Sequence, residues 1–383
     1  MDFDLTEEQR LLKESLDRLI GDRYAFEKRK SYEQAPEGWS RELWAQYAEL
    51  GLLGLPFAEE YGGSAGGPVE RMIAMEAFGR ALALEPFLAT VVLGGGFLRH
   101  GGTAEQCTAL VPQIVDGSQI FAFAQTERHS RYDLADISTT AARDGAAWVL
   151  DGEKGVVLHG DTADKLIVTA RVGGSRRDRN GIGVFIVDGN AAGVSRRGYP
   201  TQDGLRAAEI SLAGVRVGPE DVLGEPGGAL PLVERVVDEA IAALCAEAVG
   251  AMAAMHELTV DYLKTRRQFR RDIGSFQILQ HRAVDMLIAL EQARSMAMFA
   301  TMMASEDDAA ERRNAISAAK VQIGRSGRLV GQQAIQLHGG IGMTMEYKVG
   351  HYFKRVTMID TMFGDADHHL RELARRGGSK EGR

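Results

Sequence analysis

The sequence of 383 residues contains only two cysteines, Cys107 and Cys245, which lie far apart and lack the spacing of a metal site. This low cysteine content favours a reducing, cytoplasmic location over an oxidising compartment. No apolar run approaches the roughly 20 residues that span a bilayer. The N-terminus, MDFDLTEEQR, also lacks the basic start and apolar stretch of a signal peptide. We therefore expect a protein without a membrane span that stays inside the cell.

Positive charge is also in deficit, because the formal net charge is -8 at pH 7. This balance argues against nucleic acid as a main partner. No H-E-x-x-H spacing occurs, and the adjacent His368 and His369 point in different directions on a helix, so we expect no metal site. With 45% hydrophobic and 26% charged residues, the chain has the composition of a globular protein. Its length predicts two or three domains.

Hydrophobic periodicity changes twice along the chain and divides it into three parts. Helical spacing prevails up to Gly117 and again from about Leu230. Between them, short β-favouring runs such as WVLDG, KLIVTA and GVFIVD alternate with Gly, Asp and Asn turn residues at the spacing of an antiparallel sandwich or barrel. We expect an α+β protein with a helical domain at 1–117, a β domain at 118–228 and a four-helix bundle at 229–383.

Individual helices are marked by caps and apolar spacing. Thr6 with Gln9 matches a capping box, which predicts an amphipathic helix at the start of the chain. Further helices are predicted at Ser40–Gly51, Val69–Leu84, Pro86–Arg99 and Thr103–Asp116. In the last third, helices are predicted at Val233–Arg267, Ile278–Ser305, Asp307–Leu337 and Arg355–Arg375.

The stretch from Tyr262 to Met286 carries the strongest chemical signal. It places Arg266 and two aromatic rings, Phe269 and Phe276, at a loop between two helices. A guanidinium can grip pyrophosphate oxygens with paired donors, and amides at the start of the next helix add a weak preference for anions. The two rings could then flank a flat ligand. From the residues alone, a solvated basic helix end with two core phenylalanines remains an equal alternative.

This stretch resembles a signature of the acyl-CoA dehydrogenase family: a Tyr, a short spacer, Arg-x-x-Phe-Gly, a hydrophobic loop and Gln. A second run, QAIQLHGGIGMTMEYKVGHYFKR from Gln333 to Arg355, resembles the family's other signature, Q-x-x-GG-x-G. The likeness extends from the first helix to the last. It implies a helical, a β and a four-helix-bundle domain, FAD as cofactor, α,β-desaturation of an acyl-CoA thioester, and an electron-transfer acceptor.

In this family FAD is shared across a dimer, and one subunit donates the pyrophosphate and adenosine contacts to its neighbour. The resemblance assigns this role to Arg266, Gln268, Phe269, Ile273, Phe276, Gln336, Leu337, Gly339 and Gly340, and a flavin contact to Thr126. His338 would lie near the phosphates. Arg270 replaces the usual Gly after Phe269 and would either compensate at the phosphates or block the loop. A dimer of dimers is also implied.

The resemblance fails at the catalytic base. The family's usual Glu, in an I-Y-E-G-T run, corresponds here to Gly364. Other members place the Glu on the first long bundle helix, where counting back from Arg266 reaches Ala240. Glu239 lies one residue away, rotated about 100° around a helix. Glu239, Asp365 and Asp367 are weak substitutes, so no catalytic residue is assigned.

The flavin-facing loops of the middle domain depart as well. The family's T-E-P-G-x-G-S-D reads TERHSRYD here, which keeps Thr126 and Glu127 but loses glycines that allow close backbone approach. The Trp-x-Thr that covers the flavin corresponds to Val156–Leu158. One half of the cofactor site is thus eroded, whereas the other is retained.

Such a division is expected of a subunit that pairs with a paralogous large subunit, as in heteromeric members of the family that act on dicarboxylyl-CoA thioesters and steroid side chains. The runs AALCAEAVG at Ala242–Gly250 and GDADHHL at Gly364–Leu370 resemble the small subunits of such enzymes. Two alternatives stay open: a homo-oligomeric enzyme with Asp365 or Glu239 as a relocated base, and a non-catalytic scaffold. A role in fatty or dicarboxylic acid degradation follows from the resemblance, but the acyl chain does not.

Overall fold

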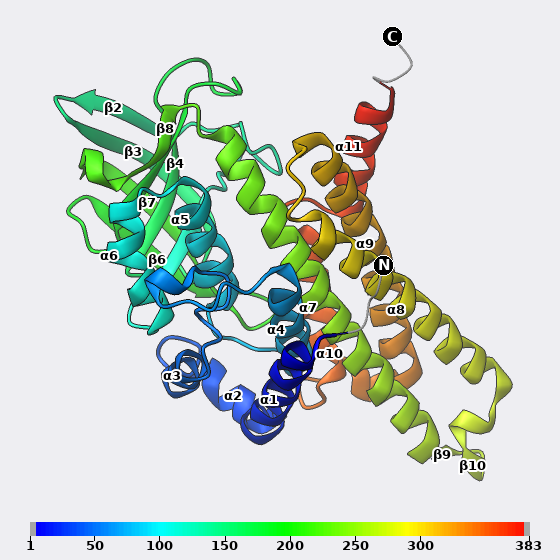
Figure 1. Ribbon diagram of the computed structural model, residues 1–383. Coiled ribbons are helices and arrows are strands. Elements are labelled where there is room, and N and C mark those ends of the chain that lie inside the picture. The colour runs from blue at the N-terminus through cyan, green and yellow to red at the C-terminus, as the bar shows by residue number, and fades with distance from the viewer. Residues whose placement is uncertain (1–4, 379–383) are drawn as a thin grey trace. The chain divides into compact units, whose positions relative to one another are not determined.

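The computed structural model describes residues 5–378 (Figure 1). Its contacts separate two compact units, which are described one at a time. The helical unit consists of Met1–Lys30, Pro68–Ala83 and Ile241–Arg383, and the mixed unit of Ser31–Gly67 and Leu84–Ala240. The expected domain boundaries at 117/118 and 228/229 stay a prediction.

The helical unit begins with α1 (Glu7–Arg23), whose predicted capping box is confirmed. The Thr6 hydroxyl accepts from the Gln9 amide at 3.2 Å, and the Thr6 amide donates to the Gln9 side chain at 3.0 Å. A short helix that the sequence did not reveal, α2 (Phe26–Glu33), follows. Its polar composition offers little apolar periodicity for a prediction to use.

Five helices form the C-terminal part: α7 (Leu230–Thr265), α8 (Gln277–Met303), α9 (Ala309–His338), α10 (Val349–Thr361) and α11 (Ala366–Gly378). Helix α9 packs against α8, α10 and α11 and so forms the centre of this group. The prediction of a single helix over Arg355–Arg375 is wrong, because the helix is interrupted by a turn between Thr361 and Ala366. Phe363 and Gly364 have positive φ there, which no α-helix contains.

Helix α4 (Pro68–Ala81) crosses α7 with the two backbones in contact. A Cβ built on Gly79 would lie 1.9 Å from the Glu247 carbonyl oxygen, and a Cβ on Gly250 would lie 1.9 Å from that of Glu76. Each helix therefore presents a glycine to the other at the crossing.

Several short helices lie in the mixed unit. Helix α3 (Arg41–Glu49) starts at Ser40, whose hydroxyl caps the Leu43 amide, and α6 (Ala104–Val115) starts at a capping box between Thr103 and Gln106. The helix expected over Pro86–Arg99 is a π-helical stretch, η2 (Leu88–Gly94), that runs into α5 (Gly95–Gly101). The remaining short turns are 3-10 helices, η1 (Glu59–Tyr61) here and η3 (Pro219–Asp221) before the last strand.

The sheet of the mixed unit has the order β6-β7-β3-β2-β4-β5-β8, with β1 paired to β4. Its strands are β1 (Phe121–Ala124), β2 (Thr140–Asp144), β3 (Ala147–Leu158), β4 (Lys165–Arg171), β5 (Ile182–Asp188), β6 (Val194–Pro200), β7 (Arg206–Val217) and β8 (Val222–Gly227). Most pairings are antiparallel, as expected, but β4 runs parallel to both β1 and β2. Strands β4 and β5 are buried almost throughout and form the centre of this core.

No helix within residues 5–378 is long and apolar enough to cross a bilayer.

A buried ion pair fastens α10 to α7. The Arg355 guanidinium donates to both carboxylate oxygens of Glu247, at 2.5 and 2.8 Å, and each residue is only 5% exposed. Replacing Glu247 with Ala removes the carboxylate that accepts two hydrogen bonds from this buried guanidinium. We expect the free energy of unfolding, measured by chemical denaturation, to fall by about 3 to 5 kcal/mol.

The matched control is Glu257→Ala, which removes the carboxylate partner of Arg80 in the same unit. That pair also has a 2.7 Å contact, but its side chains are 36% and 57% exposed. Water screens such a pair, so the loss should stay within about 1 kcal/mol. Equal losses from the two variants would contradict the structural role of the buried pair.

Candidate functional site

The first predicted motif forms a hairpin at the end of α7. Strand β9 (Arg267–Gln268) pairs with β10 (Arg271–Asp272), and Phe269 and Arg270 form the two-residue turn between them. Both turn residues have positive φ, +53° and +66°, as a two-residue hairpin of the mirror-image type requires. The chain then passes through η4 (Ile273–Ser275) into α8.

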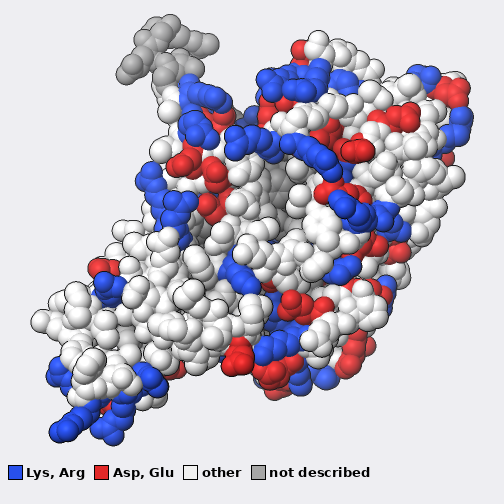
Figure 2. All heavy atoms as spheres, turned by 180° about the vertical axis from the view of Figure 1, so that it is seen from behind, with Lys and Arg blue, Asp and Glu red and all other residues white. Residues whose placement is uncertain are grey.

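Arg266 stands at the base of this hairpin with its backbone fixed on both sides. Its amide donates to the Tyr262 carbonyl at 2.8 Å, and its carbonyl accepts from the Ile273 amide at 2.9 Å. The side chain itself is exposed. Figure 2 shows Lys and Arg gathered at this end of the helical unit, at the lower left of that view. The arrangement offers an exposed guanidinium, on a fixed backbone, to an anion outside the chain.

The two phenylalanines of the motif contact each other. The rings of Phe269 and Phe276 lie edge to face with centroids 6.0 Å apart, and the Arg271 guanidinium sits 3.9 Å from the Phe276 centroid. No flat ring can lie between rings in this geometry, so the expectation that they flank a ligand is wrong for the chain by itself. Phe269 is 84% exposed and presents its outer face to solvent.

The second predicted motif meets the first through stacked rings. His338, the last residue of α9, stacks on Tyr262 of α7 with centroids 4.6 Å apart, and Tyr347 packs beside it at 5.1 Å. Arg266 follows Tyr262 by four residues, and Gln336 precedes His338 by two. The stack therefore brings the two motifs to one end of the helical unit.

Around this stack the candidate residues differ in exposure. Gln336 is exposed, as are Gly339 and Gly340 at the start of η5 (Gly339–Met343), and a Cβ built on either glycine meets no atom within 4 Å. A ligand can therefore approach this backbone. Leu337 is only 6% exposed and packs its side chain in the core, so its expected contact with the cofactor stays a prediction that only its backbone could fulfil.

His338 does not face a ligand either. Its side chain is 3% exposed, its Nδ1 lies 2.8 Å from the Ala334 carbonyl, and burial lowers its pKa. The ring is therefore neutral at pH 7 and packs between tyrosines. Its expected place near flavin phosphates is not supported.

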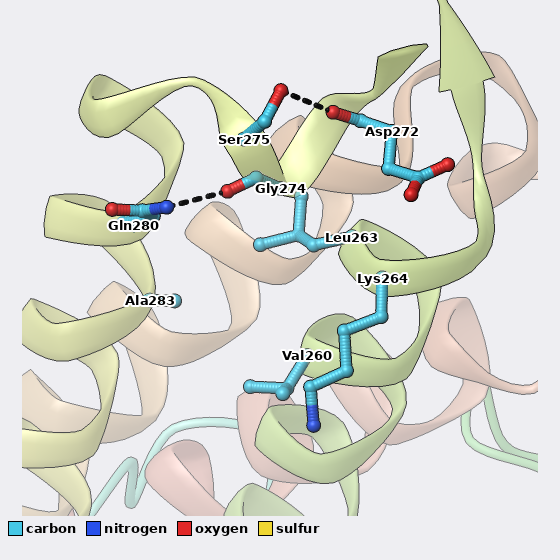
Figure 3. A pocket seen from close by; sticks show the side chains of 8 residues that line it. All are labelled: Val260, Leu263, Lys264, Asp272, Gly274, Ser275, Gln280 and Ala283. Atoms are coloured by element: carbon cyan, nitrogen blue, oxygen red, sulfur yellow. Dashed lines mark hydrogen bonds between the residues drawn. The ribbon is translucent and has the colours of Figure 1, made fainter.

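A cavity of about 490 Å³ adjoins the hairpin, between the last turns of α7, η4 and the first turns of α8 (Figure 3). Its polar rim is held by two local hydrogen bonds. Ser275 donates to the Asp272 carbonyl at 2.7 Å, and Gln280 donates to the Gly274 carbonyl at 2.7 Å. Lys264 places a cation at the wall of this cavity. The sequence did not single out this cavity, because its lining comes from two helices and a turn.

The substitutes for the missing base have other partners. Glu239 in the mixed unit is 5% exposed, and its carboxylate lies 2.5 Å from Arg99 Nη2 and 2.8 Å from His100 Nε2. A carboxylate held in an ion pair is a weak proton acceptor. In the helical unit, Asp365 accepts from the His368 amide at 2.7 Å and caps α11, and Asp367 is exposed.

Gly364, which occupies the family's usual base position, lies in a tightly held turn. The buried Lys320 ammonium donates to the carbonyls of Ile359, Asp360 and Gly364 at 2.7 to 2.8 Å. Burial lowers the Lys320 pKa to about 8. His369 contacts the Phe363 carbonyl with Nε2 at 3.1 Å.

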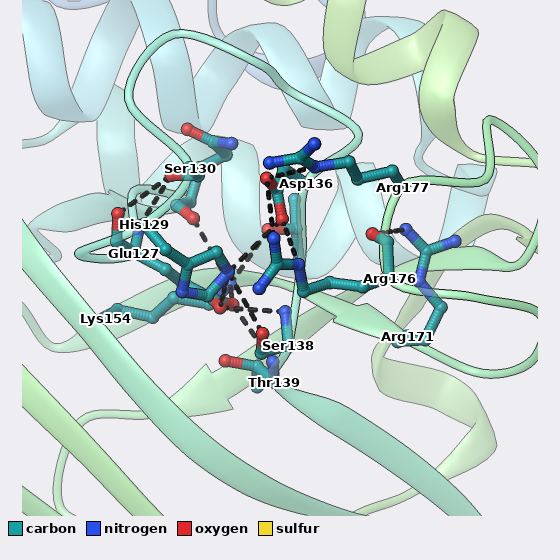
Figure 4. Close-up of polar contacts among 12 residues, drawn as sticks. Glu127, His129, Ser130, Asp136, Ser138, Thr139, Lys154, Arg171, Arg176 and Arg177 are labelled. Atoms are coloured by element: carbon teal, nitrogen blue, oxygen red, sulfur yellow. Dashed lines mark hydrogen bonds and ion pairs between the residues drawn. The ribbon is translucent and has the colours of Figure 1, made fainter.

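In the mixed unit, Glu127, which follows the candidate Thr126 in the sequence, forms the centre of a buried polar cluster (Figure 4). Its carboxylate accepts from Lys154 at 2.7 Å and from the amides of Ser138 and Thr139 at 2.8 and 3.0 Å. Burial opposes its ionisation, but Lys154 and the two amides offset this and lower the Glu127 pKa. Burial lowers the Lys154 pKa to about 8. Thr126 is half-buried.

The loop after Glu127 is anchored by arginines (Figure 4). Arg171 donates to the carbonyls of Ala135 and Arg176 at 2.6 and 2.7 Å, and Arg176 and Arg177 pair with the buried Asp136 at 2.7 and 2.8 Å. These contacts tie this loop to the one between β4 and β5. They fill with side chains a segment that the family keeps rich in glycine.

Val156, at the position of the family's Trp, is 51% exposed with a φ of +52°. The β3–β7 register shifts between Lys154 and Val157, so Val156 lies in a bulge. A positive φ is unusual for a β-branched residue. This small side chain cannot cover an isoalloxazine ring as Trp does.

No cluster of three or more His, Cys, Asp or Glu side chains that could hold a metal ion occurs within residues 5–378.

Known proteins of one family match this sequence over nearly the whole chain. Models of the acyl-CoA dehydrogenase N-terminal, middle and C-terminal domains match residues 6–118, 122–215 and 231–378. The chain is 29% identical over 381 residues to the probable acyl-CoA dehydrogenase YngJ of Bacillus subtilis, covering 98% of this chain and 99% of that protein.

Two solved structures are similar over their full length. A variant of the steroid ACAD Tcur3481-Tcur3483 has a TM-score of 0.88 at 30% identity, covering 98% of this chain and 99% of the other. The ChsE4-ChsE5 complex of Mycobacterium tuberculosis has a TM-score of 0.87 at 26% identity, covering 99% of each chain. The predicted three-part architecture is thereby confirmed.

His369 makes stability depend on acidity. Burial, with Lys320 nearby, lowers its pKa from 6.5 to about 3. The unfolded imidazole takes up a proton near pH 6.5, whereas the folded one does not until about pH 3. Between these values the unfolded chain binds more protons, so the free energy of unfolding falls as pH falls, by up to about 1.4 kcal/mol per pH unit. His369→Gln should flatten the decline in Tm between pH 6.5 and 4.

The control for this measurement is His281→Gln, which removes an exposed imidazole from α8 of the same unit. It should leave the dependence of Tm on pH as in the parent protein. A decline as steep in the His369 variant as in the control would show that acid destabilisation arises elsewhere.

Arg270 stores strain in the hairpin turn, because a residue with a Cβ at a left-handed φ costs about 1 to 2 kcal/mol. Arg270→Gly should relieve it and slow hydrogen exchange of the Ile273 amide, which closes the hairpin, about fivefold or more. Arg271→Gly, on strand β10, lacks a strained φ and should instead speed exchange. Equal effects of the two variants would contradict the strain.

Proposed function

Because this chain belongs to the acyl-CoA dehydrogenase family of FAD-dependent enzymes that oxidise the CH–CH bond of acyl-CoA thioesters, we propose that it is the small subunit of a heteromeric member. The observation that carries this is the division of its site. The hairpin and η5 offer exposed groups for a diphosphate, whereas no carboxylate stands at either base position. A paralogous large subunit supplies the base and the flavin cradle.

The phosphate end of FAD fits the residues that are present. The Arg266 guanidinium takes the diphosphate with paired donors from a fixed backbone. Gln336 and the open backbone at Gly339 and Gly340 take the adenosine side. FAD, when bound, accepts the hydride that leaves the β-carbon of the acyl chain. The chain's own task is to hold the anionic end of the cofactor.

The isoalloxazine end does not fit in the same way. Val156 replaces the covering Trp, and Arg131, with a φ of +45°, occupies the loop where the family has glycine. Glu127 and Lys154 neutralise each other inside the β domain and so offer no group to a flavin. The flavin ring that this chain's Arg266 serves therefore lies in the partner's cradle.

An apolar surface supports assembly with another subunit. Large hydrophobic side chains are exposed along α8 and around η5, which is unusual for a chain that functions alone. Those on α8 and around η5 are Ile278, Val284, Leu287, Ile288, Phe299, Met302, Ile341, Met343 and Met345. Figure 2 shows an uncharged area next to the basic tip. A dimer of dimers that includes this surface is part of the proposal.

The pairing has a parallel among the similar structures, since the ChsE4-ChsE5 complex is by its name an assembly of two components. We further propose, on the basis of the Ala242–Gly250 and Gly364–Leu370 runs, that the chain is the small subunit of a pimeloyl-CoA dehydrogenase. The substrate would then be a dicarboxylyl-CoA thioester. Electrons leave through a separate electron-transfer acceptor. The two buried, unpaired thiols support a reducing, cytoplasmic setting.

A homo-oligomeric enzyme with a relocated base is less well supported. It would need Glu239 to leave its contacts with Arg99 and His100, or Asp365 to leave the cap of α11. A scaffold without a ligand is the other alternative. It gives no reason for a fixed backbone and exposed guanidinium at Arg266.

The test is to co-express the chain with its nearest genomic paralogue and to measure bound flavin and dye reduction by pimeloyl-CoA. Arg266→Ala should weaken FAD binding by the complex at least about tenfold, because a charge-assisted contact contributes about 1.5 to 3 kcal/mol. Arg267→Ala is the matched control. That neighbouring guanidinium is exposed and lies 3.3 Å from Asp272.

The control should keep nearly all of the flavin. Loss of flavin from both variants alike would point to a general effect of positive charge, and loss from neither would favour the scaffold. Full activity of the pure chain without a paralogue would overturn the heteromeric proposal.

A further inference from the structure

The turn between α10 and α11 explains why this chain lacks a base at the family's usual position. Gly364 has a φ of +114°, a region that L-residues with a side chain rarely enter. A Cβ built on it would lie 2.6 Å from His368 Cδ2 and 2.7 Å from His369 Nε2. Carbon atoms in van der Waals contact are about 3.5 Å apart or more. Both backbone conformation and space therefore oppose any side chain at position 364.

The second of these two rings is fixed in place. His369 is 5% exposed, with Nδ1 3.2 Å from the Ser317 hydroxyl and Nε2 3.1 Å from the Phe363 carbonyl. Moving the ring to admit a side chain at 364 would break contacts to α9 and to the turn itself. Unpaired polar atoms would then remain in the core, which is costly.

The opposite side of the turn is held by a cation. The Lys320 ammonium, on α9 one turn after Ser317, is fully buried and donates to three carbonyls. Two of them, Ile359 and Asp360, belong to the end of α10, and the third is that of Gly364. Lys320 therefore fixes the peptide at 364 relative to α10. The turn is thus held by α9 from one side and by α11 from the other.

We propose that Lys320 and His369 lock the Phe363–Gly364 turn in a conformation that excludes a carboxylate side chain at position 364. The chain is then unable to gain a base there by a single substitution, and its need for a partner is built into its fold. Both residues act as positioning residues. This inference rests on the proposed function, in which the partner supplies the base.

Gly364→Ala and Gly364→Glu test the lock, made both in the chain alone and in its complex with the paralogue. Both variants place a Cβ that collides with His368 and His369. Both should therefore lower the Tm of the chain by a similar amount, about 5 °C or more. Neither should reduce dye with pimeloyl-CoA in the absence of the partner. Gly51→Ala is the control: its φ is +72°, but a Cβ there meets no atom within 4 Å. It reports backbone strain alone and should lower Tm less.

A double-mutant cycle separates the lock from a general loss of packing. In a His369→Ala background, the drop in Tm caused by Gly364→Ala should shrink, because one of the two colliding rings has gone. Independent effects at 364 and 369 would overturn the proposal. If the Glu variant does not fold, the Ala variant and the cycle still decide the question.

The outcomes also separate this inference from the proposed function. A stable Gly364→Glu chain that oxidises the thioester alone, while the parent chain does not, would overturn the lock and leave the heteromeric role intact. Oxidation by the parent chain alone would overturn the heteromeric role. A Tm loss on adding a Cβ would then still support the lock.

Discussion

The stack of Tyr262 on His338 is the contact on which the candidate site depends. Helices α7 and α9 each end where a functional segment begins, and their last aromatic residues lie 4.6 Å apart. A buried, neutral imidazole suits this place, because a charged ring would have to be desolvated between two tyrosines. Without the stack, the hairpin with Arg266 and the glycines of η5 would be two unrelated surface loops. With it, both segments lie at one end of the helical unit, as the proposed contact with a diphosphate requires.

Local signals in the sequence were enough for much of the fold. The capping boxes at Thr6 and Thr103 start helices where expected, since such caps act within four residues and need no tertiary contact. The hairpin at Phe269 and Arg270 could not be predicted in the same way. Neither residue favours a left-handed φ, so only the surrounding helices explain the turn. The parallel pairing of β4 with β1 likewise depends on contacts between distant segments.

In the candidate site, too, some features follow from local sequence and others depend on contacts between distant segments. Arg266 and Gln336 were identifiable because their exposure follows from position in a motif. The burial of Leu337 and the ion pairing of Glu239 could not be identified from the sequence, because they depend on contacts with other elements. Periodicity placed Glu239 on a helix, but only the structure shows Arg99 and His100 beside its carboxylate.

Two buried lysines show that the altered loops are ordered parts of this fold. Lys154 contacts the carboxylate of Glu127 in the β domain, and Lys320 contacts two carbonyls at the end of α10 and that of Gly364. Burial depresses the pKa of each to about 8, so each cation costs free energy that packed apolar side chains would not. What the contacts show is that each ammonium fixes the position of backbone or carboxylate oxygens around it. Each holds a segment that departs from the family pattern, the loop after Glu127 or the turn at Gly364. A chain that had merely lost its active-site residues would not need such anchors, whereas a subunit that must present a defined surface to a partner would.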